Sequence, residues 1–123
     1  MDGGNAEFAV VNEENLIPVP DDFPLDIAAA FPLTYLTAWH MVVDRCEVKS
    51  GDRVLVHAAG SGVSVAAAQI ARMWGAEVMV TAGTDSKVAQ GCENGAEFGV
   101  NYLTEDWVKA GKRWTEGKGF DII

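Results

Sequence analysis

The fold is decided by residues 54–71, which read VLVHAAGSGVSVAAAQIA. The first three residues form an apolar run too short for a helix, so they predict a buried strand. Apolar residues then recur at helical spacing from Val63 to Trp74, and Gly75 stands where a helix is expected to end. A junction of this kind points unpaired N–H groups and the positive end of a helix dipole at one place. We therefore expect an anion, above all a phosphate, to bind at the turn between strand and helix.

The turn itself contains Gly60-Ser61-Gly62, followed by Val63-Ser64-Val65. This is a G-x-G pattern that lacks the last glycine of the dinucleotide-binding motif G-x-G-x-x-G. One interpretation is that the glycines only form a tight turn in an α/β domain. The position of the turn between a buried strand and an amphipathic helix favours the other interpretation, which is phosphate binding.

Strands and helices are predicted to alternate beyond this junction. The patterns indicate strands over residues 77–82, 98–102 and 120–123, and helices over residues 85–94 and 104–115. Short connections between alternating strands and helices are typical of a parallel sheet with helices on both faces.

The N-terminal part of the chain has a different composition, because all four prolines lie at or before Pro32. We predict an arm over residues 1–32, with a flexible lead-in over residues 1–5 and a strand over residues 6–11. A short helix over residues 27–30, capped by Asp26, is expected to end at Pro32. The heavily apolar helical pattern from Leu33 to about Arg45 predicts a mostly buried helix.

The end of the second strand carries the signal for cofactor type. A domain that prefers NAD usually has an acid here to bind the ribose hydroxyls, and this chain has Ala82 instead. Thr84, Ser86 and Lys87 follow, and their hydroxyls and single cation suit a 2′-phosphate. These residues favour NADP(H), although Asp85 leaves NAD(H) open. A different interpretation is that Asp85 caps the next helix and Lys87 is merely solvated.

Composition excludes several classes of partner and site. The net charge is −9, and no Lys or Arg occurs before Arg45, so we expect no nucleic-acid partner. Cys46 and Cys92 are far apart, with only two histidines in the chain, so we predict no metal site and two small buried thiols. No signal peptide or membrane-spanning run is evident, which predicts a cytoplasmic protein without a membrane partner.

Five segments come in an order that resembles the medium-chain dehydrogenases and reductases. They are residues 6–11 (AEFAVV), 33–39 (LTYLTAW), 51–57 (GDRVLVH), 60–63 (GSGV) and 101–102 (NY). The chain looks most like the zinc-type alcohol dehydrogenase and quinone oxidoreductase branches, and the resemblance extends from Ala6 to Ile123.

The resemblance implies a Rossmann domain that binds NADP(H) and takes part in hydride transfer to or from a carbonyl, an alcohol or a quinone. In similar proteins the turn that matches Ser61-Gly62-Val63 surrounds the pyrophosphate. Residues that match Thr84, Lys87 and Tyr102 lie near the adenosine 2′-phosphate, and the match to Thr37 lies near the nicotinamide. Tyr102 as a core aromatic and Thr37 as a packed helix residue are equally compatible with the sequence.

The chain departs from the family pattern in three respects. Ser64 stands where a glycine is usual, which affects how closely the helix packs. Leu33 stands near a zinc-binding Cys and cannot bind zinc, so zinc-independent chemistry is favoured, with the hydride supplied by the cofactor. Most of the catalytic domain and the second half of the nucleotide fold have no counterpart in residues 1–123.

The predicted fold is therefore α/β, a half Rossmann with three layers (α/β/α) and parallel strands in the order 3-2-1-4. An arm with an extra strand (1–32) precedes the partial nucleotide-binding domain (33–123). We identify no catalytic residue, and activity of these 123 residues alone does not follow from the resemblance. The expected partners are a small-molecule substrate and further copies of the chain. The alternatives are a non-catalytic nucleotide-binding or assembly module derived from such an enzyme, and a truncated chain that only folds.

Overall fold

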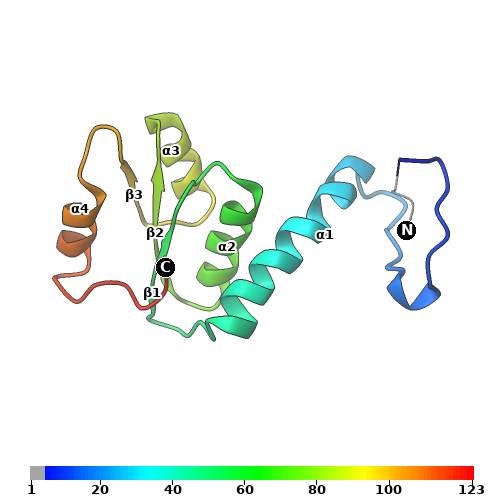
Figure 1. The fold of residues 1–123 in the computed structure, drawn as a ribbon, viewed down its shortest axis with the longest axis horizontal. Helices are drawn as coiled ribbons and strands as arrows, with labels where there is room; N and C mark the ends of the chain where they lie inside the picture. The colour runs from blue at the N-terminus through cyan, green and yellow to red at the C-terminus, as the bar shows by residue number, and fades with distance from the viewer. Residues whose placement is uncertain (1–4) are drawn as a thin grey trace.

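A computed structural model describes residues 5–123, so most of the predicted lead-in over residues 1–5 lies outside the described residues. A parallel sheet forms the centre of the molecule (Figure 1). Its strands are β1 (Arg53–Val56), β2 (Glu77–Ala82) and β3 (Phe98–Asn101). The helices are α1 (Leu25–Trp39), α2 (Gly62–Met73), α3 (Asp85–Glu93) and α4 (Trp107–Trp114).

β2 lies between β1 and β3, and both pairings are parallel. Val54 is in register with Val78, and Met79 is in register with Phe98. Parallel neighbours require a crossover between them, and α2 and α3 supply it. The carboxyl ends of the strands therefore lie at one edge, where the β1–α2 turn crosses the upper side of the sheet in Figure 1.

Alternate strand residues face opposite sides of the sheet, as the pleat requires. Val54, Val78 and Val80 belong to a buried cluster shared with α2 and the inner face of α1. Leu55 and Met79 belong to a second buried cluster on the other face, together with aromatic residues of α4 and the chain around it. The sheet is thus covered by helices on both faces, which is the layered arrangement of a Rossmann-like half domain.

α1 corrects the predicted short helix over residues 27–30. The helix begins at Leu25, follows Pro24 and continues through Pro32. Proline removes one N–H donor from the helix, but the neighbouring hydrogen bonds remain, and Thr34 Oγ1 adds a bond to the Ala30 carbonyl (3.1 Å). The helix therefore continues past the proline, and the predicted boundary between residues 32 and 33 falls inside α1.

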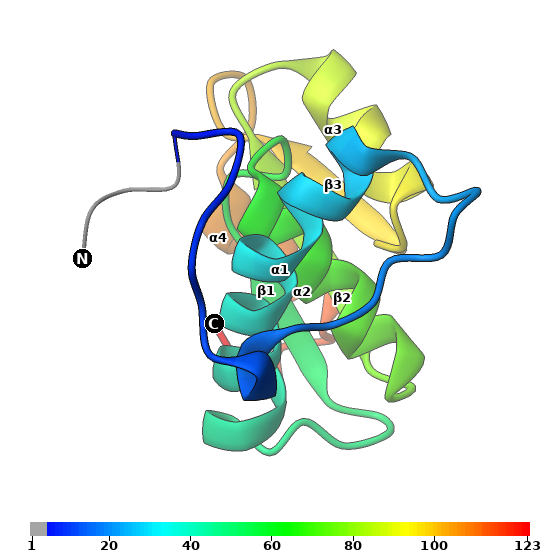
Figure 2. The ribbon, with the colours of Figure 1, turned by 90° about the vertical axis from the view of Figure 1, so that its right-hand side faces the viewer.

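The prediction that residues 33–45 form a mostly buried helix is wrong. Ala38 is the buried residue of α1, and Val42 is that of the π-helical segment His40–Arg45 which continues it. Leu33 is 78% exposed, because α1 packs on α2 along one side only. Figure 2 shows α1 running in front of α2. Cys46 and Cys92, predicted to be buried, are also exposed. Within residues 5–123, no helix has both the length and the apolar character needed to span a bilayer.

Residues 6–11 do not form the predicted strand. Their alternation of apolar and polar residues is present, but a strand also needs a neighbour to accept and donate its backbone hydrogen bonds. No neighbour pairs with these residues in the described chain, and Phe8 is 90% exposed. Among residues 5–24, the structure instead has a 3₁₀ turn, Glu13–Asn15, capped by the side chain of Asn12.

The fourth strand predicted over residues 120–123 is also not formed as a strand. A single parallel bridge joins Ile122 to Val54, and Leu55 N donates to the Ile122 carbonyl (2.9 Å). One bridged residue is too little for a ladder, so the order of the described strands is 3-2-1 and the predicted order 3-2-1-4 is not confirmed. The C-terminal segment still lies on the free edge of β1.

Candidate functional site

The β1–α2 turn brings the start of α2 to the carboxyl end of the sheet. The first helical hydrogen bond runs from Val65 N to the Ser61 carbonyl (2.9 Å). The N–H groups of Gly62, Val63 and Ser64 precede that bond, so the helix offers them no acceptor. Together with the helix dipole they make the start of α2 a favourable position for a phosphate.

A cleft of about 220 Å³ adjoins this turn. Its lining comes from the turn, the end of β2, α3 and the residue after β3: Ala58, Gly60, Ser61, Ala82, Gly83, Lys87 and Tyr102. Four of the predicted site residues are therefore brought together, although they are up to 42 positions apart in the sequence. Ligands of open α/β sheets bind beyond the carboxyl ends of the strands, which is where this cleft lies.

Two glycines let larger side chains lie against the backbone of the cleft. A Cβ atom on Gly60 would lie 3.3 Å from Lys87 Cδ, so the lysine side chain extends across the turn. A Cβ atom on Gly83 would lie 2.8 Å from Tyr102 Oη, which places the tyrosine hydroxyl against the end of β2. A cleft with one cation, the hydroxyls of Ser61 and Tyr102, and exposed backbone fits the phosphates of a dinucleotide.

The residues after β2 do not follow the alternative interpretation, in which Asp85 caps the next helix. Thr84 is the N-cap of α3 and accepts a hydrogen bond from Lys87 N (3.3 Å). Asp85 instead accepts one from Asn101 Nδ2 (2.7 Å) at the end of β3. The Thr84 and Ser86 hydroxyls lie 3.2 Å apart beside the cleft. The carboxylate is thus bound to β3, while Lys87 extends toward the turn.

Thr37 lies outside the cleft. It is exposed on α1, where its hydroxyl donates to the Leu33 carbonyl (2.6 Å). Val63 packs against the buried cluster between α2 and the sheet. A different α1 residue approaches the turn, because a Cβ on Gly62 would lie 3.0 Å from Thr34 Cγ2. Sequence patterns had no signal for this contact, since it depends on how α1 packs across α2.

The described residues contain few groups for acid–base or metal chemistry. Among residues 5–123, no three His, Cys, Asp or Glu side chains are grouped as metal ligands would be. His40 lies on the outer part of the molecule, between Asp44 Oδ2 (3.1 Å) and Arg45 Nε (3.3 Å). The cleft itself offers Lys87, two hydroxyls and the backbone of the turn, groups that suit the binding of an anion.

Comparison with known proteins agrees with this geometry. Residues 62–123 match the family model described as zinc-binding dehydrogenase. The chain belongs to the zinc-binding dehydrogenase family. The quinone oxidoreductase of Homo sapiens is 34% identical to it over 123 residues, which are all of this chain and 37% of that protein.

Solved structures of family members superpose closely on the chain. An NAD-dependent alcohol dehydrogenase is 52% identical, with a TM-score of 0.92 over 98% of this chain and 35% of that one. The Escherichia coli quinone oxidoreductase complexed with NADPH is 35% identical, with a TM-score of 0.76 over 81% of this chain and 31% of that one. The resemblance to medium-chain dehydrogenases and reductases is thereby confirmed, and the chain spans about a third of the length of these relatives.

Proposed function

We propose that the chain forms the NADP(H)-binding part of an oxidoreductase that transfers hydride to or from a carbonyl, an alcohol or a quinone. The observation that carries the proposal is the cleft in which the Lys87 side chain crosses Gly60 beside the start of α2. Quinone oxidoreductases among the solved relatives were crystallised with NADPH, which supports the same cofactor here.

Residues of the cleft and residues next to it would bind different parts of the cofactor. The N–H groups of Gly62 and Val63, at the positive end of the α2 dipole, are placed to bind the pyrophosphate. We infer that Lys87 and the Thr84 hydroxyl bind a 2′-phosphate. Lys87 and Tyr102 line the cleft, and Thr84 caps α3 next to Lys87. When bound, the nicotinamide would supply or accept the hydride.

The preference for NADP(H) over NAD(H) rests on which charges are already paired. Asp85, the acid that follows the end of β2, accepts a hydrogen bond from Asn101. Within residues 5–123, no carboxylate lies within ion-pair distance of Lys87. An unpaired lysine across the turn favours the additional phosphate of NADP(H), even though the alcohol dehydrogenase relative is described as NAD-dependent.

The substrate and the assembly belong to the same proposal. We expect a small-molecule substrate, and a homo-oligomer that covers part of the exposed apolar surface of α1. The non-catalytic alternative is less favoured, because relatives of this chain are described as quinone oxidoreductases and alcohol dehydrogenases.

The test is a titration of the full chain with NADPH and, in parallel, with NADH, followed by nicotinamide fluorescence. The variant is Lys87→Ala, and Lys112→Ala, an exposed lysine of α4, is the matched control. Losing a charged contact to the 2′-phosphate should weaken NADPH binding roughly tenfold or more. NADH binding by Lys87→Ala and both affinities of Lys112→Ala should stay unchanged.

Two results would contradict the proposal at different levels. Absence of saturable binding of either nucleotide at millimolar concentration would overturn nucleotide binding by the cleft. Equal affinity for NADH and NADPH, unchanged in Lys87→Ala, would retain nucleotide binding and overturn the preference for NADP(H).

A further inference from the structure

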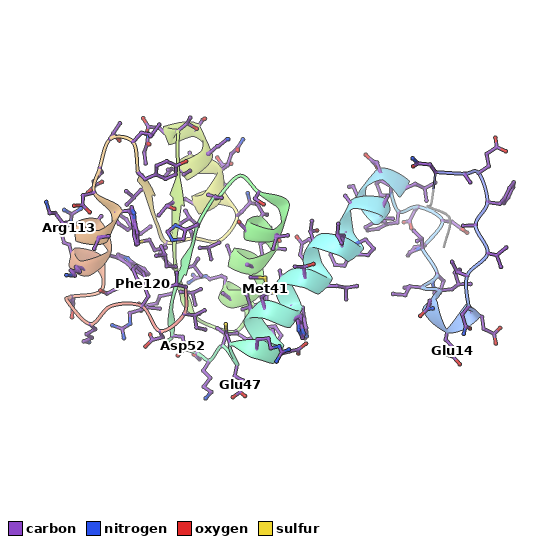
Figure 3. All side chains as sticks on the ribbon, viewed as in Figure 1. Glu14, Met41, Glu47, Asp52, Arg113 and Phe120 are labelled. Atoms are coloured by element: carbon purple, nitrogen blue, oxygen red, sulfur yellow. The ribbon has the colours of Figure 1, made fainter. Side chains whose placement is uncertain are left out.

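One alanine of the cleft has a backbone conformation that alanine rarely adopts. Ala58 has a φ of +58°, and two other non-glycine residues, Glu47 and Glu116, also have positive φ. Those two follow the C-caps of the π-helical segment and of α4, where left-handed residues are common. Figure 3 labels Glu47 beside Asp52, at the amino end of β1 and thus opposite the turn. Ala58 alone has no helix end to account for its conformation.

Hydrogen bonds on either side of Ala58 hold it in that conformation. Its carbonyl accepts a bond from Ser61 N (2.8 Å), which closes the turn. The next residue, Ala59, donates its N–H to the Thr81 carbonyl (3.0 Å). The preceding residue, His57, bonds through Nδ1 to the Thr81 hydroxyl (2.8 Å). Thr81 therefore contacts the chain immediately before and immediately after Ala58.

Thr81 contacts the turn from the face of the sheet that α4 covers. It follows Met79 by two residues on β2, so its side chain points to the α4 face of the sheet. His57 likewise follows Leu55 by two residues and packs edge-on against Trp107 of α4, with ring centroids 5.1 Å apart. Thr81 is 1% exposed and does not line the cleft. A bound nucleotide would lie on the other side of the turn.

We propose that the Thr81 side chain is a positioning group: through its hydroxyl bond to His57 Nδ1, and in addition to the backbone bond from Ala59 N to the Thr81 carbonyl, it keeps Ala58 left-handed and so holds the phosphate-binding turn in shape. The inference rests on the proposed function, since it concerns the same site. Strained residues persist where the surrounding structure fixes them, and they concentrate at binding sites. The turn then presents the amides of α2 to an anion without having to reorganise on binding.

The test compares two buried threonines. Thr81→Val removes the hydroxyl at nearly constant volume, and Thr81→Ser retains it. Thr115→Val is the matched control, because Thr115 is 3% exposed and its hydroxyl bonds to the Gly111 carbonyl and the Gly119 amide, remote from the cleft. We expect roughly tenfold weaker NADPH binding in Thr81→Val, wild-type affinity in Thr81→Ser, and wild-type affinity in Thr115→Val despite lower stability.

A double-mutant cycle with Ala58→Gly separates positioning from general loss of stability. Glycine adopts positive φ without steric cost, so the turn should depend less on Thr81 when residue 58 is glycine. Thr81→Val should then weaken NADPH binding by less than in the Ala58 background. An equal loss in both backgrounds would overturn the inference.

A second variant keeps the inference testable if Thr81→Val does not fold. His57→Phe retains a ring against Trp107 at an exposed position but removes the nitrogen that bonds Thr81. It should also weaken NADPH binding several-fold. If the wild type binds NADPH and both variants bind it equally well, the positioning role of Thr81 is overturned and the proposed function is retained. If the wild type does not bind NADPH, the proposed function itself is overturned.

Discussion

The strands of the sheet and the segment that precedes them are both rich in apolar side chains but bury them to very different extents. Val54, Leu55 and Met79 are at most 2% exposed, because helices cover both faces of the strands. In the arm and α1, Ile17 is 84% exposed and Leu33 is 78% exposed. Figure 1 shows residues 5–24 lying apart from the sheet, beyond the far end of α1.

The difference shows that hydrophobic pattern alone does not make a core. A strand of this sheet gains its cover from segments brought together by parallel pairing and by crossover helices. α1 packs mainly on α2, apart from the π-helical segment that continues it, and its inner face alone joins the buried cluster. The free energy of burial is roughly proportional to the apolar area removed from water. Little of the area on the outer face of α1 is removed.

The largest difference in stability is expected from a Leu→Ala substitution made once in the sheet and once in α1. Leu55→Ala should lower the free energy of unfolding by about 2–5 kcal/mol, because it leaves a cavity between β1 and α4. Leu33→Ala should change it by less than about 0.5 kcal/mol, because that side chain is already in water. Urea unfolding followed by tryptophan fluorescence measures both. A comparable loss in Leu33→Ala would mean that the outer face of α1 is covered in solution.

Buried and exposed positions can also be compared within α1 itself. Ala38 is fully buried against α2, so Ala38→Leu should overpack that contact and cost about 1–3 kcal/mol. Ala29 lies exposed near the other end of the helix, and Ala29→Leu should change stability by less than about 0.5 kcal/mol. The same unfolding assay serves for both variants. If Ala38→Leu were tolerated as well as Ala29→Leu, α1 would not be packed on α2 in solution.

The smallest expected effect concerns the C-terminal segment at the edge of β1. The backbone N–H of Arg53 donates a hydrogen bond to Asp121, and the Arg53 guanidinium donates a second one. These bonds, the backbone one foremost, hold the pKa of that carboxyl below its usual range. A depressed pKa in the folded state stabilises the fold above the unfolded-state value, about 4, and this stabilisation is lost as pH falls through the folded-state value.

Asp121→Asn should therefore reduce the fall in melting temperature of the chain between about pH 5 and pH 2. Asp22→Asn, an exposed acid of the arm, is the control and should leave the acid-side slope of the wild type in place. Thermal unfolding at stepped pH values gives the comparison. An unchanged slope in Asp121→Asn would show that its bond to Arg53 does not contribute to folding.

The sequence by itself determined the central elements and the place of the turn. Residues 54–71 combine a short apolar run, two glycines and helical periodicity, and these local signals agree with one another, so β1, α2 and the start of the helix were predictable. The last helix, predicted over residues 104–115, likewise forms as α4, and Asp106 caps its start by accepting bonds from Val108 N and Lys109 N. Local hydrogen bonding and spacing suffice for such features.

Tertiary structure decided everything that depends on a distant partner. Residues 6–11 alternate as a strand should, yet no neighbour pairs with them in the described chain, and Ile122 forms only one bridge to β1. The convergence of Lys87 and Tyr102 on the turn follows from the order of the strands, and the left-handed Ala58 follows from the bonds of Thr81. Backbone pairing and side-chain burial are gained only when separate segments meet, so one segment's pattern cannot specify them.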